Sequence, residues 1–148
     1  MPPIFRPYTP ADETACFEIF DSNTPPFFDP SERADLVIFL ANPPCPFFVL
    51  EQDGQVVACS GYWKQENGDI VLVWGMVRRD LHKNGLGSLM LIKRIERILA
   101  EDPQARIVVD TSQHTCAFFK RHGFKITGQH DNYYGPNLHR VDMVYTRE

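Results

Sequence analysis

The stretch Val-Arg-Arg-Asp-Leu-His-Lys-Asn-Gly-Leu-Gly-Ser, residues 77–88, decides the fold of this chain. The apolar segment 70–77 leads into it and is typical of a β-strand, and the amphipathic segment 86–100 leads out of it as a helix. Gly85 and Gly87 therefore lie where the first helical turn exposes backbone N–H groups without partners. Those groups and the helix dipole attract anions, so the pattern predicts a phosphate-binding site.

Two common phosphate-binding motifs do not fit this stretch. A P-loop carries Lys and then Ser or Thr after its second glycine, whereas Gly87 is followed directly by Ser88. A dinucleotide-binding fingerprint has a third glycine, where this chain has Met90. That fingerprint also begins directly after its strand, whereas seven residues separate Val77 from Gly85. The long loop therefore favours a phosphate-bearing ligand of another kind.

Length and charge limit the other classes of function. With 148 residues, of which 43% are hydrophobic, we expect a single domain over residues 1–148 with a substantial core. The formal net charge of −4 argues against a nucleic-acid partner, because such proteins need basic side chains against phosphates. The charge is compatible with a cationic or amine substrate.

Cysteine spacing and hydropathy indicate the compartment. The four cysteines form no Cys-x-x-Cys pair, so we expect reduced thiols, and no spacing of His and Cys suggests a bound metal. No apolar run approaches the roughly 20 residues that span a membrane. The N-terminal residues lack the apolar region of a signal peptide. We therefore expect a cytoplasmic protein without a membrane partner.

The hydrophobic pattern predicts an α/β fold with a mixed sheet. The expected strands are residues 4–6, 47–51, 56–64, 70–77, 106–111, 124–127 and 138–146. The expected helices are residues 11–20, 31–40 with Ser31 as the cap, 86–100 and 115–122. In the long helix, Lys93, Arg94, Glu96 and Arg97 are expected mostly off the apolar stripe. Strand 106–111 has no alternation, which favours a central strand parallel to 70–77.

Residues 77–88 resemble the acetyl-CoA-binding motif of the Gcn5-related N-acetyltransferase (GNAT) superfamily. That motif runs from a valine through an acidic or proline-containing segment to Arg/Gln-x-x-Gly-x-Gly/Ala. The matching residues are Val77, Asp80, His82, Gly85 and Gly87, with His82 in place of the usual Arg or Gln. A second family phrase, which ends in Phe/Tyr-x-x-x-Gly-Phe, stands at residues 117–124 as Ala-Phe-Phe-Lys-Arg-His-Gly-Phe, and the order of elements agrees over nearly the whole chain.

The resemblance implies the GNAT fold, a mixed and mostly antiparallel sheet of six to seven strands with about four helices. It also implies acetyl-CoA as a co-substrate, without a metal. The residues expected to contact acetyl-CoA are Met76, Val77, His82, Lys83, Asn84, Gly85, Leu86, Gly87, Ser88, His114 and Phe119. Met76 and Val77 are expected to offer free backbone groups to the pantetheine and the thioester oxygen, where an N–H would stabilise developing negative charge.

The implied activity is transfer of the acetyl group to a primary amine by direct attack in a ternary complex. The acceptor is a protein N-terminus, a small amine or an amino acid, and the tail around residues 132–143 loosely resembles the branch that acetylates protein N-termini. Phe27, Phe28 and Tyr133 are expected to line the acceptor site, with packing as the alternative for each. Many relatives form homodimers, so a homodimer is expected as one assembly.

The proton-transfer residues depart from the family pattern. Strand 70–77 carries no carboxylate where many members have a glutamate, and Phe119 replaces the tyrosine that serves as general acid. We therefore expect Asp110, at the C-terminal end of the parallel strand, as the base, with helix capping as its alternative role. Tyr134 or Tyr133 is the expected proton donor. Both departures keep open a second reading, a non-catalytic acyl-CoA-binding or sensing module of the same fold.

Overall fold

A computed structural model describes residues 2–147 of the chain. The strands are β1 (Ile4–Pro7), β2 (Phe47–Gln52), β3 (Gln55–Lys64), β4 (Ile70–Val77), β5 (Ile107–Thr111), β6 (Phe124–Gly135) and β7 (Leu138–Tyr145). The α-helices are α1 (Glu13–Ser22), α2 (Arg33–Ala41), α3 (Leu86–Glu101) and α4 (Cys116–Arg121). Short 3-10 turns at Pro10–Asp12, Pro30–Glu32 and Arg79–Leu81 lead into α1, α2 and the loop before α3.

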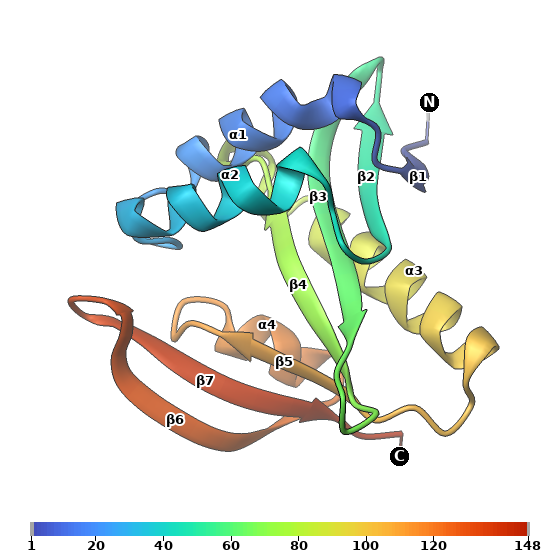
Figure 1. Ribbon diagram of the computed structural model, residues 1–148, viewed down its shortest axis with the longest axis vertical. Coiled ribbons are helices and arrows are strands. Elements are labelled where there is room, and N and C mark those ends of the chain that lie inside the picture. Colours follow the sequence, from blue (N-terminus) through green and yellow to red (C-terminus); the bar gives the residue numbers. More distant parts are fainter. Residues whose placement is uncertain (1, 148) are drawn as a thin grey trace.

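All seven strands form one sheet in the order β1-β2-β3-β4-β5-β7-β6 (Figure 1). Neighbouring strands are antiparallel except for β4 and β5, which run parallel and are joined through α3. The predicted mixed sheet, its parallel central pair and the number of α-helices are therefore confirmed. A parallel pair needs a crossover long enough to hold a helix, and the amphipathic segment 86–100 supplies it.

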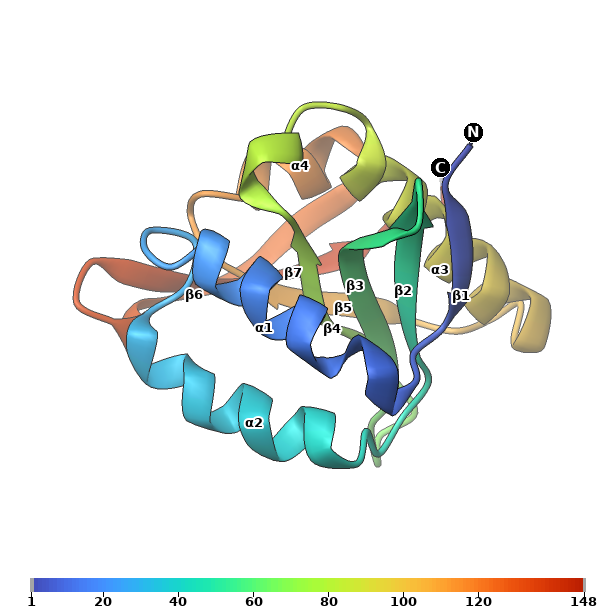
Figure 2. The ribbon, with the colours of Figure 1, turned by 90° about the horizontal axis from the view of Figure 1, so that it is seen from above.

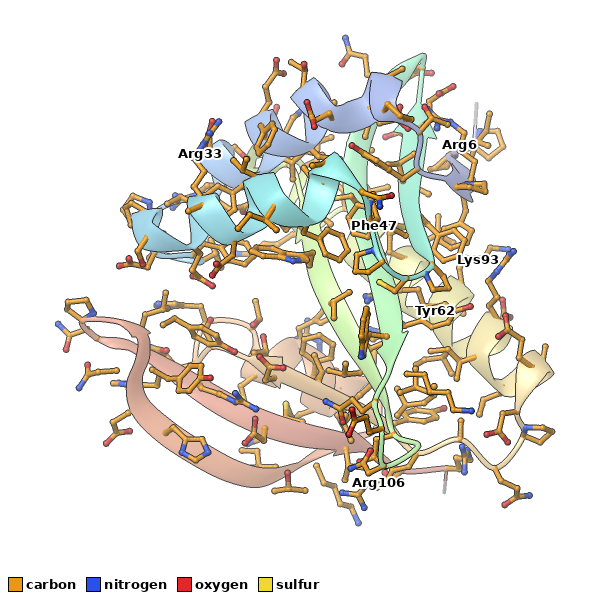
Figure 3. All side chains as sticks on the ribbon, in the orientation of Figure 1. Arg6, Arg33, Phe47, Tyr62, Lys93 and Arg106 are labelled. Carbon is orange, nitrogen blue, oxygen red and sulfur yellow. The ribbon has the colours of Figure 1, made fainter. Side chains whose placement is uncertain are left out.

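The helices cover the two faces of the sheet. Helices α1 and α2 lie on one face, and α3 and α4 lie on the other (Figure 2). Side chains that alternate along the strands fill both cores: Phe47 packs toward α1 and α2, and Tyr62 packs toward α3 (Figure 3). No helix within residues 2–147 is long and apolar enough to cross a membrane.

The start of the second helix differs from the prediction. Asp29, not Ser31, is the capping residue, and its carboxylate accepts a hydrogen bond from the Ser31 N–H at 3.0 Å. Pro30 explains the shift, because proline favours the first helical position and places the cap one residue before it. Glu32 completes a capping box by accepting the Asp29 N–H at 2.8 Å.

The last hairpin is longer than the sequence suggested. Strand β6 extends to Gly135, whereas only residues 124–127 were expected as strand. Glycine and polar residues from 128 to 132 resemble a loop, yet this segment pairs with β7 through two register irregularities. Asn132, with φ of 55°, lies at the second of them. The hairpin therefore carries Tyr133 and Tyr134 on a strand near its tip.

Helix α3 also corrects one prediction. Arg94 is only 4% exposed and lies on the buried face together with Met90 and Ile98, although it was expected off the apolar stripe. Residues four apart share a helix face, so position 94 is a core position by geometry. The hydropathy pattern missed it because arginine there does not count as apolar.

Candidate active site

Strands β4 and β5 separate soon after they meet. Strand β5 pairs only with the first three residues of β4, Ile70 to Leu72, and Figure 1 shows the two strands diverging beyond that point. Two β4 residues, Trp74 and Gly75, lie opposite the single β3 residue Ser60, which makes a β-bulge. A bulge increases the local twist and re-aims the strand. From Val73 onward, the β5-facing edge of β4 has no strand partner within residues 2–147.

The N-terminus of α3 lies at the far end of that free edge. Gly85 is the N-cap in a left-handed conformation, with φ of 81°, and no side chain caps the helix. The first helical hydrogen bond runs from the Leu89 N–H to the Gly85 carbonyl at 3.0 Å, so the N–H groups before it have no helical partner. Lys83 and Asn84 are exposed beside it. The Leu86 side chain is buried in the core, so only the backbone of this residue can contact a ligand.

Several predicted contact residues already have partners. The Val77 carbonyl accepts hydrogen bonds from Asn23 Nδ2 and His82 Nε2, each at 2.9 Å, so this group is not free as expected. The Met76 side chain is buried under α1 and α2. Ser88 Oγ bonds to His122 Nε2 at 2.9 Å, which ties α3 to the end of α4. Apart from this occupied carbonyl, the backbone contacts of Met76 and Val77 with the pantetheine and the thioester stay a prediction.

The two phenylalanines of the loop before α2 lie in different surroundings. The Phe28 ring packs against Phe20 and, at 6.1 Å, against Trp74 of the bulge. The Phe27 ring makes edge contacts with His82 at 5.1 Å and with His114 at 5.8 Å. His82 precedes α3 and His114 precedes α4, so Phe27 joins the two loops that flank the opening between β4 and β5.

Phe119, which was expected to contact acetyl-CoA, lies in the core. Its side chain is 9% exposed and packs between Phe118 and Phe124. The Phe118 ring instead lies beside Gly87, 3.5 Å from the position of a Cβ there. The family phrase therefore places Phe118, rather than Phe119, against the N-terminus of α3.

Asp110 and Tyr134 come together at the narrow end of the opening. Asp110 follows Val109, the last β5 residue that pairs with β4. The Tyr134 hydroxyl donates a hydrogen bond of 2.7 Å to Asp110 Oδ2. Burial, and then the neighbouring Asp110 carboxylate, raise the pKa of the Tyr134 hydroxyl well above its ordinary value, so it keeps its proton at neutral pH. Tyr133 is 58% exposed and carries the Arg140 guanidinium over its ring at 4.8 Å.

Glu32 is a titratable group at this site that the sequence analysis missed. Its half-buried carboxyl lies in the first turn before α2, and burial raises its pKa to about 7, with smaller upward effects from Asp29, Asp35 and Asp110. The hairpin tip closes over this corner, because a Cβ on Gly135 would collide with the Asp29 carboxylate. The capping-box sequence Asp-Pro-Ser-Glu signals the turn of Glu32, but the approach to Asp110 exists only in three dimensions.

The comparison with family models decides the identity. Residues 14–124 match the model of the acetyltransferase (GNAT) family. The chain belongs to the GNAT family. It is thus an acetyl-CoA-dependent N-acetyltransferase, as the two motifs around residues 77–88 and 117–124 indicated. No curated protein sequence matches the chain.

Solved GNAT structures share its fold across nearly the full length. The ribosomal-protein-S18-alanine N-acetyltransferase from Escherichia coli has a TM-score of 0.79 at 18% identity, covering 97% of this chain and 92% of its own. Ard1 from Thermoplasma volcanium has a TM-score of 0.78 at 18% identity, covering 99% and 100%. The putative acetyltransferase yncA from Salmonella typhimurium, solved with acetyl-CoA, has a TM-score of 0.74 at 18% identity, covering 100% and 95%.

The residues of this GNAT chain fit acetyl-CoA. A pyrophosphate is doubly charged, and the uncapped α3 terminus offers it several N–H groups with a nearby lysine. The bulge leaves strand backbone for the amide-bearing pantetheine arm. In the described part of the chain, no three His, Cys, Asp or Glu side chains gather as a metal site would require.

Proposed function

We propose that the enzyme acetylates a primary amine by direct attack within a ternary complex with acetyl-CoA. The acceptor class comprises peptide N-terminal amines, small amines and amino acids. The observation that carries this proposal is the Asp110–Tyr134 pair, which stands where β5 leaves β4, at the narrow end of the free β4 edge. Carboxylates beside an open backbone edge suit an amine that must approach a thioester, because they accept hydrogen bonds from its N–H groups.

The neutral form of the amine reacts, and the step balances with two proton transfers. The amine nitrogen bonds to the thioester carbonyl carbon, the carbon–sulfur bond breaks, and the sulfur leaves as a thiolate. One amine proton passes to the enzyme, and the thiolate takes up a proton from water. A free thiol has a pKa of about 8.5, so its thiolate is a good leaving group without an enzymic acid. This chemistry is compatible with phenylalanine at position 119.

Three side chains bind and deprotonate the acceptor amine in this proposal. Asp110 accepts a hydrogen bond from the neutral amine, and Tyr134 fixes the orientation of the Asp110 carboxylate through its 2.7 Å hydrogen bond. Glu32 accepts the proton, because a base with a pKa near the working pH is the most effective. Phe27, Phe28 and Tyr133 surround the approach, where they select the group that bears the amine.

Release of CoA thiol tests the proposal. Acetyl-CoA is incubated with the protein and, in separate reactions, with an N-terminal peptide panel, small amines and amino acids. We expect amine-dependent release of free thiol together with an acceptor mass gain of one acetyl group. Thermal stabilisation by acetyl-CoA without thiol release from any acceptor would support the binding module instead.

The Tyr134→Phe variant tests the orienting contact. Loss of a hydrogen bond to a charged group costs about 1.5–3 kcal/mol, so we expect kcat/KM to fall by about 10- to 100-fold. Tyr145→Phe is the matched control, since it removes one tyrosine hydroxyl from a ring that packs against Phe124, outside the proposed site. Equal kcat/KM for Tyr134→Phe and the wild type would remove Tyr134 from the proposed site.

A further inference from the structure

We propose that Arg94 is a positioning residue for acetyl transfer. Its buried guanidinium holds the β4 bulge in the geometry that presents free backbone to the thioester, and it adds positive potential there. The inference rests on the proposed function, because it concerns the same reaction. It gives a role to a side chain of α3 that no motif of the sequence includes.

The placement of Arg94 is unusual for a charged group. The residue is 4% exposed and shares the core-facing side of α3 with Met90 and Ile98. No carboxylate within residues 2–147 lies close enough to form an ion pair with it, and the Cys59 thiol is the titratable group that acts on its pKa. Burial lowers the pKa of the guanidinium only to about 10, so it remains charged at neutral pH.

The guanidinium spans the bulge from one strand to the other. Its Nη1 donates to the Gly61 carbonyl of β3 at 3.2 Å, and its Nε donates to the Met90 carbonyl of α3 at 3.4 Å. On β4, Nη2 lies 3.3 Å from the position that a Cβ of Gly75 would occupy. Gly61 borders the register shift, and Gly75 lies within it. The fork therefore bonds β3 and lies against β4 where β4 departs from regular pairing.

Packing of the core does not require a positively charged side chain at position 94. An apolar side chain of similar length would fill the space without burying an unpaired charge, which is costly in a protein interior. Proteins keep destabilising features of this kind mainly at functional sites. The reaction supplies the reason: negative charge develops on the thioester oxygen, and fixed positive charge beside the bulge stabilises it.

Arg94→Met tests the proposal, with Lys93→Met as the control that removes one exposed charge from the same helix. For Arg94→Met we expect kcat to fall by about 10- to 100-fold, the KM for acetyl-CoA to change little, and the melting temperature to stay equal or rise. Arg94→Lys, which keeps the charge but not the fork, is expected to recover part of kcat. Lys93→Met should behave as the wild type.

Gly75→Ala changes the contact between Arg94 and β4 from the β4 side. This variant tests the proposal if Arg94→Met does not fold. The added methyl stands 3.3 Å from Nη2, so the guanidinium must shift while its charge stays. We expect a lower kcat with an unchanged KM for acetyl-CoA. An unchanged kcat in either folded variant would overturn the proposal, as would a loss of kcat that merely follows a loss of melting temperature. Failure of the proposed function is distinct, since the wild type itself would then release no thiol.

Discussion

Gly85→Glu is expected to abolish acetyl-CoA binding. Gly85 caps α3 at φ of 81° beside N–H groups that have no partner, so the new carboxylate would stand where a pyrophosphate must approach. Like charges repel at this helix end, and we expect the Kd for acetyl-CoA to rise by at least 100-fold, or about 2.7 kcal/mol. Isothermal titration calorimetry and ligand-induced thermal stabilisation measure the change.

The control for Gly85→Glu is Gly54→Glu in the β2–β3 turn. Gly54 has nearly the same positive φ, 80°, and like Gly85 has open space around the position of a Cβ. Both variants therefore carry the same backbone strain, and only one of them affects the α3 terminus. Equal acetyl-CoA binding by the two variants would show that the pyrophosphate lies elsewhere.

Glu32→Gln is expected to lower kcat/KM by about 100-fold and to change its pH dependence. Loss of a general base typically costs 10²- to 10⁴-fold. Because the pKa of Glu32 is about 7, wild-type activity should fall below that pH through protonation of both Glu32 and the acceptor amine. In Glu32→Gln only the amine remains to titrate, so the slope of log kcat/KM should drop from about two to about one.

Asp35→Asn is the matched control. It removes one exposed carboxylate from α2, three residues after Glu32, which lies in the turn before that helix. Its kcat/KM profile should keep the limb near pH 7. A Glu32→Gln profile that retained both titrations would assign the base elsewhere, and Asp110→Asn would then be the next variant to measure.

The same raised pKa predicts a stability effect. The folded state binds the Glu32 proton more tightly than the unfolded chain, so stability falls as the pH rises from the ordinary value of 4.5 through about 7. Glutamine removes this loss. Glu32→Gln should therefore melt at a higher temperature than the wild type at pH 8, and at a similar temperature at pH 4, as scanning calorimetry can measure.

Much of the part of the site that is expected to bind acetyl-CoA could be predicted from local sequence. The strand, the long loop and the glycines before α3 place backbone N–H groups by short-range rules, and those rules also excluded the P-loop and dinucleotide motifs. The predicted cap of the second helix was wrong because two sequence signals competed there. Ser31 is a typical capping residue, but Pro30 takes the first helical position, so Asp29 before it is the cap. The polar segment of β6 resembled a loop because its pairing comes from β7 rather than from its own composition.

By itself, then, the sequence determined the fold class, the GNAT motifs and the uncapped helix terminus, because each depends on residues close together in the chain. Only the tertiary structure decided which side chains gather at the proposed acceptor site. Glu32 and Asp110 are far apart in sequence, and the fold brings them close enough for Asp110 to raise the pKa of Glu32. The tertiary structure also places Arg94 against the bulge, because packing buries a helix position whatever the hydropathy of its residue.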